Sequence, residues 1–210
     1  MSLTLLERPA AGEPEGTLVL LHGRGADEYD LHPLLDALDP ERRLRGLTPG
    51  GPLALPPGGR HWYRLGGIPT PEPETFWPSF TELAELLDGL QKPLVLGGFS
   101  QGAVMSYALS LGRGPEKRPA ALLALSGFMP SVDGLELDLT GLDGFPVAIA
   151  HGTLDPVIPV DFSRAARDAL AAAGAAVAYH EAPIGHGIDP QFIPALRGVV
   201  AHATGTQQQR

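Results

Sequence analysis

The sequence contains no cysteine, and this absence excludes several kinds of chemistry at once. A chain without thiols forms no disulfide, offers no thiolate to a metal ion and has no cysteine nucleophile. No apolar run approaches the ~20 residues that a membrane-spanning helix needs. Residues 1–15 also lack the basic start and apolar core of a secretory signal peptide. We therefore expect a cytoplasmic protein without a membrane span.

Positive charge is also in short supply. The chain has 15 Lys and Arg against 24 Asp and Glu, a formal net charge of −9, and its basic residues do not gather into a patch. Nucleic acids and anionic membranes both attract basic surfaces, so we expect neither as a partner. At 210 residues, with 43% hydrophobic and 19% charged, the chain suits one globular domain. We place this domain at residues 1–203, followed by a polar tail at 204–210.

Short apolar runs alternate with amphipathic stretches from end to end, which is typical of βαβ units around a mostly parallel sheet. The runs are nearly continuous in Leu, Val and Ala, as in strands covered by helices on both faces. Strands are predicted at Thr17–His22, Leu44–Thr48, Leu94–Phe99, Ala121–Ser126, Val147–Ala150 and Ala176–Glu181, with an edge strand at Ser2–Leu6. The predicted fold class is α/β, with a mostly parallel central sheet and helices on both faces.

Apolar residues spaced three and four apart predict the helices between these strands. The helices are expected at Leu31–Leu38, Phe76–Leu90, Gln101–Leu111, Phe162–Ala173 and Phe192–Val200. Gly174 suits the C-terminal cap of the fourth helix. Asp189 suits the N-cap of the last helix, and Pro190 its first turn.

Glycine and proline concentrate in residues 50–73, where two aromatic residues, Trp62 and Tyr63, interrupt them. Such a composition forms neither a long helix nor a central strand. A loop of this length inside a compact domain usually serves function, so we interpret the segment as a lid or a substrate loop. The alternative is a disordered insertion, which the two aromatic side chains disfavour.

The most specific motif is Gly98-Phe99-Ser100-Gln101-Gly102, a G-x-S-x-G that follows an apolar run and precedes a helical one. In this strand–turn–helix context the serine sits in a strained turn that lifts its hydroxyl above the sheet. The glycines leave room for strand and helix to approach each other. The motif predicts Ser100 as a nucleophile.

A serine hydroxyl needs a base to attack at neutral pH. Where this motif occurs, a carboxylate and then a histidine follow the serine along the chain, each in a loop at the carboxyl end of a later strand. Asp155 lies in the loop after Val147–Ala150, and His186 lies between two glycines in the loop after Ala176–Glu181. We predict His186 as the general base and Asp155 as the carboxylate that orients it.

Other interpretations use the same residues. Asp155 precedes Pro156 and could only start a turn, and His186 could be an ordinary loop histidine. A metal-dependent hydrolase would need His151, Asp155 and His186 to meet, but the chain has no H-E-x-x-H motif and no cysteine ligand. We interpret His151 as structural and expect no metal and no cofactor. Phosphate-loop and dinucleotide-binding motifs are missing as well.

Acyl transfer also requires two hydrogen-bond donors for the oxyanion. One is expected from the backbone N–H of Gln101, directly after the nucleophile. The other should come from the loop after an early strand, His22-Gly23-Arg24-Gly25, and we assign it to the backbone N–H of Arg24. The His22 side chain is expected to shape this loop rather than to transfer protons. The alternative is a simple glycine turn.

Four motifs together resemble the phospholipase/carboxylesterase family, which includes bacterial carboxylesterases and the acyl-protein thioesterases. These are HGRGADEYDL at residues 22–31, GFSQG at 98–102, HGTLDPVIP at 151–159 and GHG at 185–187. The resemblance covers nearly the whole chain, from about residue 17 to 200. It implies a single-domain α/β-hydrolase fold without a cofactor that acts on carboxylic esters or thioesters. It also implies the same triad roles for Ser100, Asp155 and His186.

The first motif divides the family. Acyl-protein thioesterases typically carry H-G-L-G-D, whereas this chain has H-G-R-G-A-D-E and looks more like the bacterial carboxylesterase branch. We therefore interpret the protein as a serine carboxylesterase that works through an acyl-serine intermediate. The alternatives are a thioesterase or small-acyl transferase with the same triad, and a non-catalytic ligand-binding protein on a hydrolase scaffold.

Substrate recognition is expected to involve apolar residues above the nucleophile. Trp62 and Tyr63, together with Phe128 and Met129 after the strand ending at Ser126, are predicted to wall the acyl or alcohol pocket. The alternative is that all four are core residues. The expected partner is a small-molecule ester, and the expected state is a monomer or a homodimer.

Overall fold

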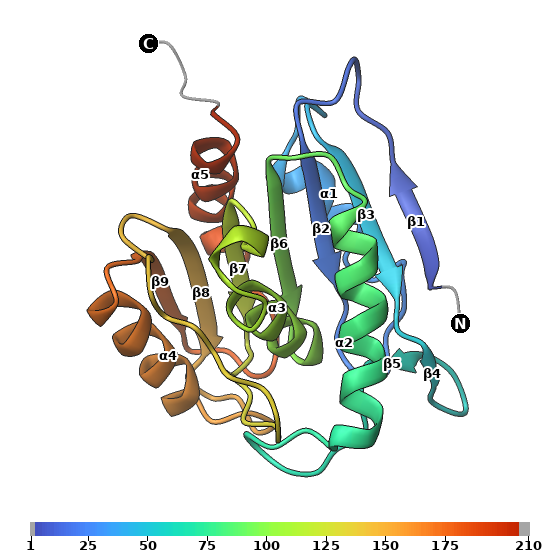
Figure 1. Ribbon diagram of the computed structural model, residues 1–210, viewed down its shortest axis with the longest axis vertical. Coiled ribbons are helices and arrows are strands. Elements are labelled where there is room, and N and C mark those ends of the chain that lie inside the picture. The colour runs from blue at the N-terminus through green and yellow to red at the C-terminus, as the bar shows by residue number, and fades with distance from the viewer. Residues whose placement is uncertain (1–2, 206–210) are drawn as a thin grey trace.

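The computed structural model describes residues 3–205 and is built around one seven-stranded sheet (Figure 1). The strand order is β1-β3-β2-β6-β7-β8-β9, and neighbouring strands are parallel except for β1 and β3. The strands are β1 (Thr4–Arg8), β2 (Thr17–Leu21), β3 (Arg45–Gly50), β6 (Leu94–Phe99), β7 (Ala121–Leu125), β8 (Pro146–Gly152) and β9 (Ala176–Ala182). Residues 206–210 of the polar tail lie outside the described part.

Helices cover both faces of this sheet. They are α1 (His32–Leu38), α2 (Pro73–Asp88), α3 (Gln101–Leu111), α4 (Asp161–Ala172) and α5 (Ile193–Ala203), with short 3-10 turns at Pro115–Lys117 and Pro190–Phe192. Helices α2, α3 and α4 lie in front of the sheet in Figure 1, and α1 and α5 lie behind it. Within residues 3–205, none of these helices combines the length and the apolar character that a bilayer crossing requires.

Strand β2 explains why both faces are covered. Successive side chains of a strand point to opposite faces of the sheet. Leu18 and Leu20 pack into the cluster that contains residues of α1 and α5, whereas Val19 and Leu21 pack into the cluster of α2 and α3. All four are at most 1% exposed. Burying a side chain of this size stabilises the fold by about 1.5–3 kcal/mol, so a strand that is apolar on both sides belongs in the centre.

The predicted α/β fold class with a mostly parallel sheet is confirmed. Each predicted strand and helix has an observed counterpart whose ends differ by a few residues; the edge strand is β1 rather than Ser2–Leu6, and Ser2 lies outside the described residues. Asp189 caps the last helical segment, accepting a hydrogen bond from the backbone N–H of Gln191 (3.0 Å). Gly174 follows α4 with a φ of +93°, as a C-terminal cap requires.

The glycine- and proline-rich segment 50–73 is tied to the loop that follows β2. It contains the two short strands of a hairpin, β4 (Leu53–Ala54) and β5 (Arg60–His61). The backbone N–H of Gly25 donates to the carbonyl of Arg60 (2.8 Å), and the N–H of Arg60 donates to the carbonyl of Ala26 (2.7 Å). Segments that are distant in the sequence therefore form one surface beside the end of β2.

The carboxyl ends of the parallel strands meet at the lower edge of the sheet in Figure 1. The loops that follow β2, β6, β8 and β9 carry Arg24, Ser100, Asp155 and His186, respectively. Open α/β sheets form their sites at this edge, because the loops there converge while the strands hold them in place. The topology thus brings all the predicted reactive groups to one end of the molecule.

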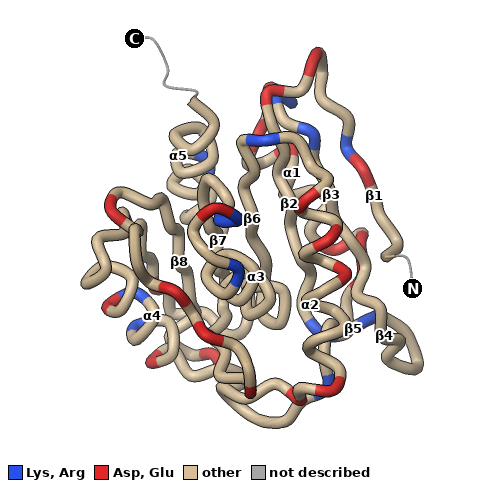
Figure 2. The backbone as a smooth tube through the Cα atoms, viewed as in Figure 1, with Lys and Arg blue, Asp and Glu red and all other residues tan. Residues whose placement is uncertain are grey.

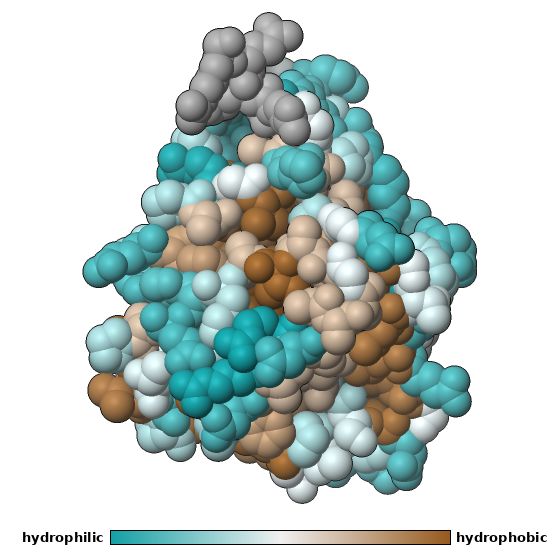
Figure 3. Space-filling view, turned by 90° about the vertical axis from the view of Figure 1, so that its left-hand side faces the viewer, coloured by the Kyte–Doolittle hydropathy of each residue, from teal (hydrophilic) through white to brown (hydrophobic). Residues whose placement is uncertain are grey.

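Charged side chains flank the exposed edge strand β9, which within residues 3–205 pairs with β8 alone. Arg164 bonds both carboxylate oxygens of Glu181 (2.8 and 2.7 Å), and Arg167 lies over the ring of Tyr179 at 4.6 Å. A band of hydrophilic residues crosses this side of the molecule in Figure 3, and acidic and basic residues are interspersed along the chain in Figure 2. Charge beside an edge strand discourages pairing with a further chain.

A buried ion pair holds the antiparallel edge strand β1. Arg8 Nη2 lies 2.6 Å from Asp39 Oδ2, and the same guanidinium donates to the carbonyls of Leu35 and Leu44. Asp39 also accepts hydrogen bonds from the backbone N–H groups of Arg43 and Leu44. Arg8 and Asp39 are 3% and 7% exposed. This cluster joins β1 to the end of α1 and the start of β3.

Replacing Asp39 should destabilise the fold strongly. Asp39→Ala removes the buried carboxylate that pairs with Arg8 and leaves the guanidinium only the longer contact with the half-exposed Asp36 (3.4 Å). Breaking a buried pair costs about 3–5 kcal/mol in comparable sites. The free energy of unfolding, measured in urea, checks this. As a control, Asp168→Ala removes an exposed pair with Arg167 and should leave the free energy of unfolding almost unchanged. Equal effects of the two variants would contradict a structural role for the buried pair.

Candidate active site

Ser100 occupies the turn between β6 and α3 in a strained conformation. Its φ of 54° and ψ of −119° lie in a region that residues other than glycine seldom adopt. Its backbone N–H donates to the carbonyl of Leu125 (2.9 Å). A Cβ on Gly102 would lie 1.9 Å from the backbone oxygen of Leu21, and one on Gly98 would lie 2.4 Å from the backbone carbon of Gly102. Both glycines are therefore required by the close approach of α3 to β2 and β6.

Three side chains from different loops form a hydrogen-bonded chain. His186 Nε2 lies 2.9 Å from Ser100 Oγ, and His186 Nδ1 lies 2.6 Å from Asp155 Oδ2. A carboxylate only accepts, so the proton of the neutral imidazole sits on Nδ1 and Nε2 can accept from the serine hydroxyl. The Asp155 side chain is 0% exposed and that of His186 19%. The structure thus brings together the three residues that the sequence predicted to act together.

The Asp155 carboxylate is buried yet well supplied with donors. Its Oδ1 accepts the backbone N–H groups of Val157 (2.8 Å) and Ile158 (3.0 Å), while Oδ2 faces His186. Burial raises the pKa of the Asp155 carboxyl, but the hydrogen bonds from His186, Ile158 and Val157 outweigh burial and leave the pKa below its ordinary value. The carboxylate therefore remains charged beside the imidazole.

A second histidine touches the same carboxylate. His151, 2% exposed, has its Nε2 2.8 Å from the carbonyl of Ile158 and 3.3 Å from Asp155 Oδ2, and its Nδ1 bonds the hydroxyl of Ser163. Because two acceptors face Nε2, the proton lies on that nitrogen. The sequence indicated only a structural role for His151. The contact between His151 and Asp155 could have been suspected from the sequence, because His151 begins the loop that carries Asp155.

The loop after β2 lies against the nucleophile. A Cβ on Gly23 would be 3.4 Å from Ser100 Cβ, so the loop backbone borders the serine directly. Within residues 3–205 no group accepts a hydrogen bond from the N–H of Arg24. The N–H of Gln101, the first residue of α3, has no acceptor within its own helix. Both N–H groups predicted as oxyanion donors are therefore available to a ligand.

His22 holds this loop in shape. Its Nε2 accepts the backbone N–H of Gly51 (2.8 Å), so the ring proton lies on Nδ1, which donates to the carbonyl of Gly23 (2.7 Å). Burial lowers the pKa of His22 and keeps the ring neutral. The Gly23 carbonyl and the Arg24 N–H belong to one planar peptide, so orienting the carbonyl also orients the donor. The hydrogen bonds of His22 to Gly23 and Gly51 are therefore the contacts through which it would shape the loop, as expected from the sequence.

Trp62 and Tyr63 are core residues. They are 0% and 1% exposed; Trp62 Nε1 donates to the carbonyl of His22 (2.8 Å). The Gln101 side-chain amide accepts from the N–H of Trp62 (3.1 Å) and donates to the carbonyl of Tyr63 (2.8 Å). Side chains without accessible surface do not contact a substrate, so the structure corrects the prediction that these two wall the pocket. Trp62 instead supports the loop after β2 through its hydrogen bond to His22.

The segment after β7 contacts the His186 loop. Phe128 is 3% exposed with its ring 6.0 Å from that of Phe162, whereas Met129 is half-buried and retains accessible surface. A role in the pocket stays a prediction for both Phe128 and Met129. Ser126, which the sequence did not single out, has a φ of 51° and donates from its hydroxyl to the carbonyl of Gly187 (3.2 Å). This hydrogen bond holds the loop that carries His186.

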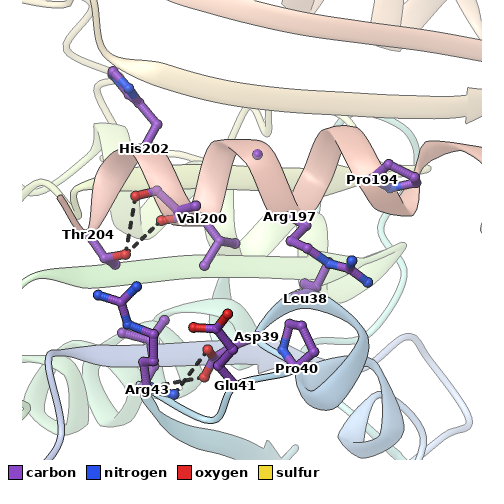
Figure 4. A pocket seen from close by; sticks show the side chains of 13 residues that line it. Leu38, Asp39, Pro40, Glu41, Arg43, Pro194, Arg197, Val200, His202 and Thr204 are labelled. Atoms are coloured by element: carbon purple, nitrogen blue, oxygen red, sulfur yellow. Dashed lines mark hydrogen bonds between the residues drawn. The ribbon is translucent and has the colours of Figure 1, made fainter. Parts of the chain in front are cut away.

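A groove of about 770 Å³ lies at the opposite edge of the sheet, between the end of α1 and helix α5 (Figure 4). Its two arginines already have partners, because Arg43 pairs with Glu15 and Arg197 donates to the carbonyl of Ala37. The groove shares no residue with the loops of Ser100, Asp155 and His186. Across residues 3–205, no three His, Asp or Glu side chains are grouped to hold a metal ion.

The chain is similar to known proteins in both sequence and fold. A profile of the family described as Phospholipase/Carboxylesterase matches residues 8–202. An acyl-protein thioesterase 1 of Yarrowia lipolytica is 27% identical over 180 residues, which cover 76% of this chain and 78% of that protein. The crystal structure of the Bacillus cereus carboxylesterase superposes with a TM-score of 0.79 at 25% identity, covering 96% of this chain and 94% of that one. Esterase PE8 gives a TM-score of 0.79 at 25% identity, covering 97% and 100%.

The lowered pKa of Asp155 predicts a pH-dependent contribution to stability. The carboxylate stabilises the fold at pH values above its unfolded pKa of about 3.9, and this contribution is lost as the pH falls through the lower pKa of the folded state. The free energy of unfolding should be measured from about pH 7 to about pH 3 for the wild type and Asp155→Asn. The difference between the two proteins should shrink in acid. A difference that is constant with pH would contradict this account.

Proposed function

Because the chain belongs to the phospholipase/carboxylesterase family of α/β hydrolases, we propose that it is a serine carboxylesterase acting through an acyl-serine intermediate. The observation that carries this proposal is the hydrogen-bonded chain from Ser100 Oγ through both ring nitrogens of His186 to Asp155, with distances of 2.9 and 2.6 Å. Such an arrangement serves to activate a hydroxyl for attack on a carbonyl. The reaction needs water as its second substrate and no cofactor.

In the proposed first half-reaction, Ser100 Oγ attacks the ester carbonyl while His186 Nε2 takes the hydroxyl proton. The tetrahedral oxyanion is held by the backbone N–H groups of Arg24 and Gln101, donors of a kind whose loss typically costs about 3 kcal/mol of transition-state stabilisation. His186 then returns its proton to the departing alkoxide, so that an alcohol leaves and the acyl group remains on Ser100. Asp155 stabilises the imidazolium that forms in between.

In the second half-reaction, His186 takes a proton from water, and the resulting hydroxide attacks the acyl-serine carbonyl. The same two N–H groups hold the second oxyanion. Its collapse expels Ser100 Oγ, which recovers the proton from His186, and the free acid leaves. Each bond formed is matched by one broken, and the enzyme returns to its starting state.

Thioester hydrolysis is the second candidate. The acyl-protein thioesterase 1 of Yarrowia lipolytica, with which this chain shares 27% identity, favours it. The same triad would act, with a thiolate in place of an alkoxide as the leaving group. The H-G-R-G-A-D-E sequence after β2, in place of H-G-L-G-D, supports the oxyester. The ratio of thioester to oxyester kcat/KM for one acyl group separates the two candidates.

Replacing the nucleophile should abolish the activity. Ser100→Ala removes the attacking oxygen, so the rate on p-nitrophenyl butyrate should fall by at least about 10³-fold. The release of p-nitrophenol checks this, and covalent labelling of Ser100 by a fluorophosphonate is a second, independent readout. If the variant hydrolyses the ester as fast as the wild type, the proposed nucleophile is wrong.

Two substitutions of His151 should separate its contacts. Asn retains a polar group near Nδ1, on the Ser163 side, whereas Gln reaches the position of Nε2, on the Asp155 side. We expect His151→Asn to lower kcat by roughly 10- to 100-fold through misplacement of Asp155, and His151→Gln to lower it less. Steady-state kinetics on p-nitrophenyl butyrate checks the order. The reverse order would show that the Ser163 contact matters more than the carboxylate.

A further inference from the structure

We propose that the Arg24 side chain selects esters that carry a carboxylate close to the scissile carbonyl, such as monoesters of short dicarboxylic acids. This inference rests on the proposed esterase function and names a substrate class for the same site. Arg24 follows Gly23, whose backbone borders Ser100, and its own N–H is one of the two proposed oxyanion donors. The guanidinium of Arg24 therefore lies within one side-chain length of the place where the ester carbonyl would bind, and there it would determine specificity.

Arg24 differs from the other arginines of residues 3–205 in having no bonded or paired group. Within residues 3–205, no carboxylate or carbonyl bonds its guanidinium, although the chain has 24 acidic and 15 basic residues. Arg64 forms a long ion pair with Glu72 at 4.0 Å. The remaining arginines of the described part bond a carboxylate or a backbone carbonyl, namely Arg8, Arg42, Arg43, Arg45, Arg60, Arg113, Arg118, Arg164, Arg167 and Arg197. Among the arginines of residues 3–205, the one without a partner therefore lies on the loop beside Ser100.

Two acidic neighbours on the same loop, Asp27 and Glu28, have contacts of their own. Asp27 Oδ1 accepts the backbone N–H of Tyr29 (3.0 Å), and Glu28 Oε2 lies 3.9 Å from Arg60 Nε. Neither carboxylate forms an ion pair with Arg24. A substrate carboxylate would therefore meet a guanidinium that is free to bind it.

The charge of Arg24 acts on a buried histidine of the neighbouring hairpin. His61, at the end of β5, is 7% exposed. Burial lowers the pKa of His61, and the nearby charges of Arg24 and Arg64 lower it further. Arg64 is itself largely exposed, with its guanidinium 4.0 Å from Glu72. The guanidinium groups of Arg24 and Arg64 thus act on His61, whereas the carboxylates of Asp27, Glu28 and Asp30 act on His22.

The backbone around Arg24 is held firmly enough to direct its side chain. The N–H of Gly25 donates to the carbonyl of Arg60, the N–H of Arg60 donates to the carbonyl of Ala26, and His22 fixes the carbonyl of Gly23. A planar guanidinium on such a base binds a carboxylate through two parallel hydrogen bonds, which recognises geometry as well as charge. Because Arg24 is exposed, salt should weaken this selection.

The test compares matched esters with the purified full-length chain. Monoethyl glutarate and ethyl pentanoate have acyl chains of equal length and differ in the terminal carboxylate. Acetoxyacetate and propyl acetate place the same difference in the leaving alcohol. Acid release is followed in a pH-stat, with Ser100→Ala as the background. The readout is the ratio of kcat/KM for the anionic ester to that for its neutral match, so any effect on the shared oxyanion donors cancels.

We expect Arg24→Met to lower this ratio roughly tenfold in at least one pair, mainly through KM, because one charge-assisted contact is lost at an exposed site. The pair that responds tells whether the carboxylate belongs to the acid or to the alcohol. Arg24→Lys should retain part of the ratio, since it keeps the charge without the planar fork. Added NaCl should lower the ratio of the wild type and not that of Arg24→Met. The control Arg167→Met, on α4, should leave the ratio unchanged.

Unchanged ratios in both pairs, with the neutral esters still hydrolysed, would overturn the role of Arg24 and leave the esterase proposal intact. If the wild type hydrolyses none of the four esters and Ser100 takes no fluorophosphonate label, the esterase proposal itself fails. A variant that fails to fold does not block the test, because the salt dependence of the wild-type ratio and the Arg24→Lys ratio report on the same charge. A wild-type ratio that does not respond to salt would also overturn the inference.

Discussion

The contact between helix α3 and the backbone of β2 is the constraint on which the rest of the site depends. A Cβ on Gly102 would lie 1.9 Å from the backbone oxygen of Leu21, so the helix begins directly above the strand end. This closeness forces the turn at Ser100 into a positive φ and points the first N–H groups of α3 toward the same space as the serine hydroxyl. It also places the loop after β2 beside the nucleophile. One steric requirement therefore sets the positions of Ser100, the first N–H of α3 and the neighbouring loop together.

Around this turn, buried polar groups hold Asp155, the loop of His186 and the Arg24 peptide in position. The Asp155 carboxylate is oriented by backbone N–H groups and by His151, and the loop of His186 is held by the Ser126 hydroxyl. The Arg24 peptide is oriented through His22. A buried polar group without a partner is costly, so these networks have one arrangement that satisfies all members. The geometry of the site is therefore fixed by hydrogen bonds between several loops rather than by a single helix or strand.

Most of the fold was predictable from the sequence because its signals are local. Apolar runs identify strands whatever their neighbours, Asp189 and Gly174 mark helix ends, and G-x-S-x-G describes a turn within five residues. Topology then carries Asp155 and His186 to the edge where Ser100 lies, since parallel strands end together. Trp62 and Tyr63 show the limit of such reasoning. Their segment has the composition of a surface loop. Its backbone nevertheless bonds to the Gln101 side chain, and both rings are buried in the core.

By itself, the sequence determined the α/β architecture, the strained turn of Ser100 and the loops in which His186 and Asp155 lie, because each depends on a short motif or a period within the chain. Only the tertiary structure decided which groups support them. His151 reaches Asp155 and Ser163, and His22 reaches Gly51, across separations that no local pattern encodes. It also decided that Arg24 has no partner within residues 3–205. Whether a charge is paired depends on every other side chain within reach, and that is a property of the folded chain alone.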